Sequence, residues 1–122
     1  MLDYKELSVW QESRILVKEV YILSVNFPKE EIFGLTNQIR RAVVSIPSNF
    51  AEGHNRYSDK EFLHFLKIAK GSAAEVETQI ILAIDLGYLT EEDGNKILSR
   101  TDKIMRMLGA FISKVKEKSE TE

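Results

Sequence analysis

One pair of residues in the sequence has the spacing of a metal-binding helix. Glu61 and His64 lie three residues apart, as in di-iron helix bundles that present a carboxylate and an imidazole from one helix. Such a centre needs a second Glu-x-x-His pair and two further glutamates. The only other histidine, His54, follows Ala51 at that distance. We therefore expect no metal site and interpret Glu61 as part of a helix start.

Other residue types that carry catalysis lack a suitable setting. Glu75 and Glu77 are two positions apart, so on a helix they would not face each other. The chain has no cysteine, and its serines lie in no Gly-x-Ser-x-Gly elbow. It also has no glycine-rich phosphate loop. We predict that the protein is not an enzyme, has no catalytic residue and needs no cofactor.

The strongest candidate for function is a local excess of positive charge. Residues 36–71 carry six basic and three acidic side chains, whereas the whole chain has a formal net charge of −2. Clustered lysine and arginine side chains bind phosphates, so a nucleic-acid-binding surface is one interpretation. An ordinary charged exterior is the other, and Arg40 and Arg41 could instead pair with glutamates. The candidate nucleic-acid-binding residues are Arg40, Arg41, Arg56, Lys60 and Lys67.

A second set of basic residues follows later in the chain, at the spacing of one helix. These residues are Lys96, Arg100, Lys103 and Arg106.

The hydrophobic pattern predicts that helices position these side chains. Apolar residues recur at intervals of three and four, and no segment of useful length alternates with the period of a strand. Ser58 and Glu61 form a capping box, and Gly53 and Gly87 are expected helix C-caps. The predicted helices are 4–26, 35–53, 58–86 and 90–118.

Within the second helix, Thr36 or Asn37 is the expected N-cap, and Pro47 should bend the helix without ending it. In the first helix we expect one buried face, formed by Leu7, Trp10, Val17, Val20, Tyr21 and Ser24.

Four long helices with short connections favour an all-α fold, an up-down four-helix bundle. We assign one domain to residues 1–118 and a frayed tail to residues 119–122. The N-terminus has no apolar core of a signal peptide and no segment is long enough to span a membrane, so we expect a cytoplasmic protein.

The apolar surface looks wider than one bundle core requires. The segment from Ile80 to Leu86 is apolar nearly all round, and a helix of that kind must be covered on every side. Either the core stripe is wide or the protein associates with itself. Gly71, by contrast, is expected to permit close packing between helices. The candidate interface residues are Ile80, Ile81, Ile84, Leu98, Met105 and Ile112.

Two segments resemble a known family. The run from Gly34 to Gly53 includes Arg40-Arg41, Ser45-Ile46-Pro47-Ser48-Asn49 and Ala51-Glu52-Gly53. It is similar to the signature of the bacterial 23S ribosomal RNA intervening-sequence proteins. So are Phe62-Leu63-x-x-Leu66-x-x-Ala69-x-Gly71-Ser72-x-x-Glu75-x-Glu77-Thr78-Gln79 and Leu86-Gly87-Tyr88-Leu89. The resemblance extends over nearly the whole chain.

The resemblance implies a four-helix bundle that assembles into a ring-like homopentamer. A related protein, the accessory variability protein of diversity-generating retroelements, binds nucleic acid and a reverse transcriptase through a basic surface. On this chain, Arg40, Arg41 and Arg56 occupy the matching basic positions. We predict a non-enzymatic homo-oligomer that binds RNA or DNA. The alternative is an oligomeric adaptor that binds another protein and no nucleic acid.

Overall fold

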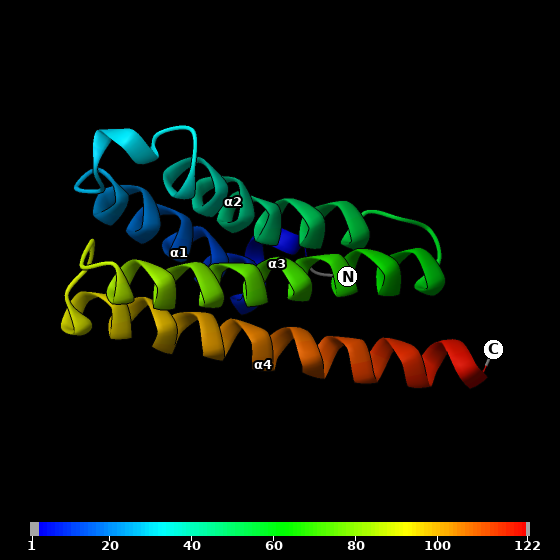
Figure 1. Cartoon of the computed structure of the whole chain (residues 1–122). Helices are drawn as coiled ribbons and strands as arrows, with labels where there is room; N and C mark the ends of the chain where they lie inside the picture. The colour runs from blue at the N-terminus through cyan, green and yellow to red at the C-terminus, as the bar shows by residue number, and fades with distance from the viewer. Residues whose placement is uncertain (1–2, 122) are drawn as a thin grey trace.

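The computed structural model describes residues 3–121 of the chain and consists of helices (Figure 1). Four long α-helices lie side by side, and two short 3₁₀ turns precede α1 and α2. The elements are η1 (Tyr4–Glu6), α1 (Ser8–Ser24), η2 (Lys29–Glu31), α2 (Leu35–His54), α3 (Asp59–Asp85) and α4 (Glu91–Thr121).

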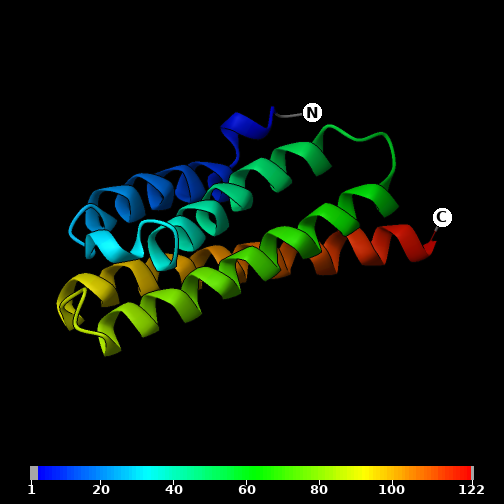
Figure 2. The ribbon, with the colours of Figure 1, turned by 45° about the horizontal axis from the view of Figure 1, so that its top comes forward.

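Each α-helix packs against two others. α1 contacts α2 and α4, and α3 also contacts α2 and α4, while within residues 3–121 α1 and α3 do not touch. α1 and α3 are therefore diagonal to each other, which is the arrangement of an up-down four-helix bundle (Figures 1 and 2). The predicted fold class is confirmed.

The ends of α3 follow from its local sequence. Ser58 Oγ accepts a hydrogen bond from the Glu61 N–H over 3.1 Å, which confirms the N-cap. Gly87 has a positive φ of 79°, and the Tyr88 N–H donates to the Ala83 carbonyl over 2.8 Å. This pattern is the Schellman motif, which requires a residue that tolerates the left-handed region. Gly87 is the C-cap that the sequence predicted.

α2 runs through Pro47 without ending, as predicted. Pro47 has no N–H to donate to the Val43 carbonyl, yet the helix continues for two turns beyond it. Ile46 and Phe50, on either side of Pro47, are both fully buried. The hydrophobic core on this face holds the helix together where one backbone hydrogen bond is missing.

Two cap predictions for α2 are wrong. The helix begins at Leu35, before Thr36 and Asn37, because Glu31 Oε1 in η2 accepts the Leu35 N–H over 3.1 Å. Gly53 lies inside the helix and does not adopt the left-handed region. Its role is steric, since a Cβ on Gly53 would lie 2.7 Å from the Cβ of Phe65 in α3.

The first predicted helix also differs from the structure. The chain extends at Leu7, so Tyr4–Glu6 form a separate 3₁₀ turn and α1 starts at Ser8. The buried face of α1 is rotated from the predicted one, and Tyr21 is exposed. The buried residues of α1 are Val9, Ser13, Leu16, Val20 and Ser24.

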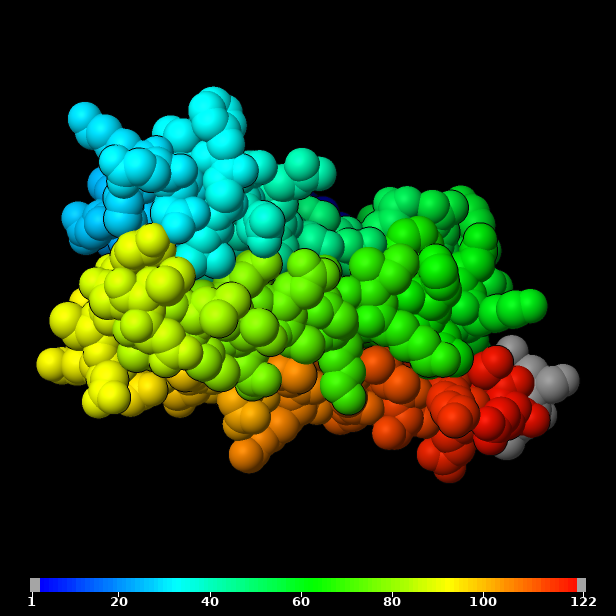
Figure 3. Space-filling model, in the orientation of Figure 1, coloured from blue at the N-terminus to red at the C-terminus, as the bar shows by residue number. Residues whose placement is uncertain are grey.

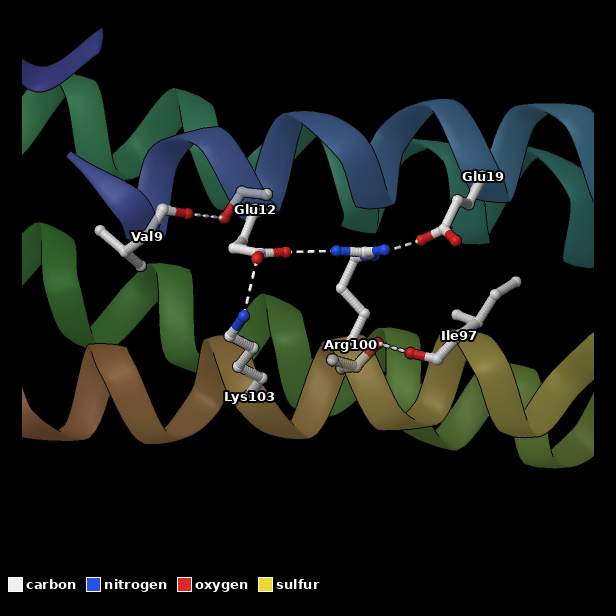
Figure 4. A network of polar contacts seen from close by, with 8 residues as sticks. Val9, Glu12, Glu19, Ile97, Arg100 and Lys103 are labelled. Carbon is white, nitrogen blue, oxygen red and sulfur yellow. Dashed lines mark hydrogen bonds and ion pairs between the residues drawn. The ribbon is translucent and has the colours of Figure 1, made fainter. Parts of the chain in front are cut away.

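Two fully buried hydroxyl groups, those of Ser13 and Thr101, bond within their own helices. Ser13 Oγ donates to the Val9 carbonyl over 2.7 Å, and Thr101 Oγ1 donates to the Ile97 carbonyl over 2.8 Å (Figure 4). Each hydroxyl is therefore satisfied without a partner on another helix.

α4 extends through Thr121. The frayed tail was predicted for residues 119–122, but Ser119–Thr121 belong to this helix. Glu122 lies outside the described residues. None of the described helices combines the length and the hydropathy needed to cross a membrane.

Candidate nucleic-acid interface

The predicted basic residues do not form one patch. Arg40 and Arg41 lie in the first half of α2, and Arg56 follows its end. From Arg40 to the end of α2 at His54 the helix rises about 21 Å, so Arg40 and Arg56 lie near opposite ends of the bundle. Lys60 and Lys67 lie seven positions apart in α3 and so share one of its faces. The structure brings together Arg56 and Lys60 and leaves Arg40 and Arg41 elsewhere.

Arg40 makes contacts that join α2 to α1. Its Nε donates to Ser24 Oγ over 2.9 Å, and its guanidinium lies 4.8 Å from the centre of the Tyr21 ring. The Ser24 hydroxyl is itself buried. Arg40 therefore has a structural role. Its partners are Ser24 and Tyr21, whereas the sequence had suggested glutamates.

Arg41 is exposed and borders a shallow polar groove between α2 and α3. Glu75 lies on the opposite side of this groove, whose volume is about 420 Å³. Below them the hydroxyls of Ser45 and Ser72 are 2.8 Å apart and share a hydrogen bond. One cation and one carboxylate give this groove no net charge.

A more strongly charged hollow lies at the other end of the bundle. At that end the α2–α3 connection lies near the C-terminal part of α4 (Figures 1 and 2). We call this hollow the basic groove. Its volume is about 800 Å³, and four basic side chains border it against the single carboxylate of Asp59. The basic residues are Arg56, Lys60, Lys114 and Lys118.

Aromatic rings form the inner wall of the basic groove. Phe62 of α3 and Phe111 of α4 contact each other with ring centres 6.1 Å apart. The His54 ring lies edge-on to Phe62 at 5.8 Å. Phe50, fully buried beneath them, contacts all three rings at 5.3–6.0 Å. The wall is therefore fixed by the bundle core, while the cations around it stay at the surface.

Arg56 is held in place at the edge of this groove. It pairs with Glu52, one helical turn earlier, at 2.5 Å, and its guanidinium lies 5.1 Å from the centre of the Phe65 ring. Both members of the pair are about half exposed. Lys60 and Lys114 are exposed, and within residues 3–121 neither forms an ion pair with a carboxylate, so their charge is available to a ligand.

Two of the four residues in the second basic set, on α4, pair with carboxylates of α1. Arg100 binds both Glu12 and Glu19, and Lys103 Nζ donates to Glu12 Oε1 over 2.8 Å (Figure 4). The hydrogen bond from Lys103, with the nearby Arg100, holds the pKa of the Glu12 carboxyl below its ordinary value despite partial burial. Arg106 pairs with Asp102 on its own helix at 3.0 Å. This set joins helices and is a poor candidate for phosphate binding.

Of the predicted interface residues, Ile80 is wrongly placed. It is 1% exposed and belongs to the core of the single chain, so a second subunit cannot reach it. Ile81 is 44% exposed and remains a candidate. The other four are half-buried and pack against the core: Ile84, Leu98, Met105 and Ile112.

Sequence reasoning missed other exposed apolar side chains. Ile15 and Ile22 lie seven positions apart on one side of α1, and the exposed Val25 directly follows this helix. Leu82 on α3 and Leu86 directly after it are also exposed, and both lie in the apolar segment 80–86 for which a covering partner was predicted; α3 crosses the face shown in Figure 3. The spacing of these apolar residues in the first helix was visible in the sequence. The predicted buried face of that helix was rotated from the real one, so they were not recognised as exposed.

The Glu61–His64 pair has other partners in the structure. The Glu61 carboxylate accepts from the Ser58 hydroxyl over 3.2 Å, and the His64 ring lies edge-on to Phe65 at 5.3 Å. Among residues 3–121, no three histidine or carboxylate side chains converge on a point that could hold a metal ion.

Comparisons with known proteins cover most of the chain. A family model described as 23S rRNA-intervening sequence protein matches residues 5–110. The fold is similar to a crystal structure of a protein with unknown function from the S23 ribosomal protein family of Bacteroides thetaiotaomicron. That match has 28% identity and a TM-score of 0.77 over 85% of this chain and 97% of that chain. A search of curated proteins found no match. The matched range includes Arg56 and Lys60 and ends before Lys114.

Proposed function

Because this chain belongs to the 23S rRNA-intervening sequence protein family, we propose that it is a non-enzymatic, homo-oligomeric bundle that binds nucleic acid through a basic surface. The proposal places that surface at the basic groove. Arg40 is left out of it, since its guanidinium is committed to α1.

The charge of the basic groove is the observation that carries the proposal. Among residues 3–121, four basic side chains from three segments and one carboxylate border this hollow, with Arg56 paired to Glu52 at its edge, in a chain whose net charge is negative. The ammonium groups of Lys60 and Lys114 come from different helices, so they can contact successive phosphates of one strand. Lys67 extends the same face along α3.

Exposed apolar residues on two sides of the bundle support self-association. α1 and α3 are diagonal, so the set on α1 and the set on α3 point in different directions. A two-fold dimer uses one patch twice, whereas a closed ring joins two different patches head to tail. The two sets therefore favour a ring, and the family resemblance implies five subunits.

Repetition around a ring would strengthen weak binding. Each subunit would carry one basic groove, and a strand held at one groove reaches the next at a high effective concentration. A modest affinity at each site would then suffice for stable binding.

Two measurements test the proposal. On an immobilised mixed-sequence RNA, the protein should be retained at low salt and released steeply as salt rises, because bound phosphates release counterions. Light scattering at micromolar concentration should return a mass several times 14.0 kDa. Passage through the RNA column at low salt, with the oligomer intact, would instead support the adaptor function.

A further inference from the structure

Tyr57 occupies an unusual position beside the basic groove. It lies in the four-residue connection between α2 and α3, and its side chain is fully exposed, at 104% of the reference area. The connection itself is well ordered by hydrogen bonds. The Arg56 N–H donates to the Gly53 carbonyl over 3.1 Å, and Ser58 caps α3 directly after Tyr57. The backbone thus presents this ring to solvent at the lip of the groove.

The groove combines charge with aromatic surface. Phosphate binding alone requires cations, and the rings of His54, Phe62 and Phe111 add nothing to it. In a duplex the bases are paired and stacked on each other, so their faces cannot meet these rings. In a single strand the base faces are free, and aromatic side chains bind them by stacking without regard to sequence.

We propose that the basic groove binds single-stranded nucleic acid, with the Tyr57 ring stacked on one base while Lys60 and Lys114 hold the phosphates next to it. This inference rests on the proposed function and specifies its ligand. The volume of about 800 Å³ accommodates an unstacked base with its sugar, since ligand pockets span roughly 300–1,000 Å³. RNA and DNA strands share the chemistry that this site recognises.

The test compares three labelled ligands by fluorescence anisotropy at one low salt concentration. They are a 20-nucleotide RNA, the DNA of the same sequence, and that DNA annealed to its complement. Wild-type protein should bind both single strands at least tenfold more tightly than the duplex. A difference between the RNA and DNA strands would identify the preferred sugar.

Substitution of Tyr57 separates stacking from charge. Tyr57→Ala should weaken single-strand binding roughly five- to a hundredfold, the range for losing one base–aromatic stack. Tyr57→Phe keeps the ring and should stay within about twofold of wild type. Because the side chain is fully exposed, neither change should alter the helical circular dichroism spectrum.

Several outcomes would overturn the inference. Equal or tighter duplex binding, or an unchanged affinity for Tyr57→Ala, would exclude the stacking site. The double variant Lys60→Ala with Lys114→Ala shows what remains if the stacking site is excluded. If it still weakened binding, nucleic-acid binding would stand and only the single-strand assignment would fall. If neither strand bound at all, or a 20-residue polyglutamate bound as tightly, the proposed function would fall with it.

Discussion

Arg100 on α4 donates a hydrogen bond from Nε to Oε1 of Glu19 on α1, over 2.6 Å. Its guanidinium also binds Glu12, about two turns earlier on the same helix as Glu19. α1 and α4 are far apart in sequence, and this arginine links them at two carboxylates, next to the Lys103–Glu12 pair (Figure 4). Removing it should therefore loosen the packing of α1 on α4.

We expect Arg100→Ala to lower the free energy of unfolding by about 1–2 kcal/mol, because two half-buried carboxylates lose a charged donor. Urea denaturation at a fixed protein concentration measures this. Arg106→Ala is the matched control, since it removes an exposed pair within α4 and should cost less than about 0.5 kcal/mol. Equal costs for the two variants would contradict the structural role of Arg100.

The pKa of Glu12 predicts how stability depends on pH. Its donors, first Lys103 and then Arg100, lower the pKa in the folded state below the ordinary value of 4.5. A lowered carboxyl pKa stabilises the fold fully above the unfolded-state pKa, and the contribution is lost as pH falls through the folded-state pKa. The urea midpoint should therefore drop below about pH 4.5, and Glu12→Gln should drop less steeply. Parallel curves for the two proteins would exclude a contribution from Glu12.

Two glycines in helices should respond in opposite ways to alanine. A Cβ on Gly53 would lie 2.7 Å from Phe65 Cβ and 3.0 Å from Phe62 Cδ1, so Gly53→Ala should destabilise by about 1–3 kcal/mol. Gly71 is exposed with nothing within 4 Å, so Gly71→Ala should stabilise α3 by about 0.5–1 kcal/mol. Thermal or urea unfolding of the two variants, compared with wild type, measures both changes in stability. The prediction that Gly71 permits close packing between helices was therefore wrong. Destabilisation by Gly71→Ala would instead support that prediction.

The fold could be predicted because its signals are local. The spacing of apolar residues in α3 and α4, the Ser58 cap and the Gly87 turn each depend on a few neighbouring residues. The predicted helix bounds failed where a single neighbouring residue overrides the apolar spacing. Glu31 in η2 sets the start of α2, and Leu7 breaks the helix that Tyr4 begins.

The candidate site was predicted only in part because its residues come from distant segments of the chain. Arg56 and Lys60 are close in sequence, so their charge was visible as a cluster. Lys114 and Phe111 reach the groove from the other end of the chain, which only the antiparallel packing of α3 and α4 reveals. Arg40 appeared equivalent to Arg41, but adjacent helical residues point about 100° apart, and Arg40 faces α1.

Substitutions at the adjacent residues Ile80 and Ile81 should distinguish a core position from an interface position. Ile80→Ala empties a buried site and should destabilise the fold by about 2–4 kcal/mol. Ile81→Glu places a charge on an exposed apolar patch and should lower the oligomer mass in light scattering while leaving helical circular dichroism unchanged. An unaltered mass for Ile81→Glu would remove this residue from the interface.

The salt dependence of RNA binding tests the central claim most directly. The logarithm of the binding constant falls linearly with the logarithm of salt concentration, by about 0.7 per phosphate contact on a single strand. Lys60→Ala with Lys114→Ala should therefore reduce the slope by about 1.4 and weaken binding at low salt. Lys96→Ala with Arg106→Ala removes the same charge outside the groove and should leave the slope near that of wild type. Equal slopes for the two double variants, or a wild-type protein that binds no RNA, would contradict the account.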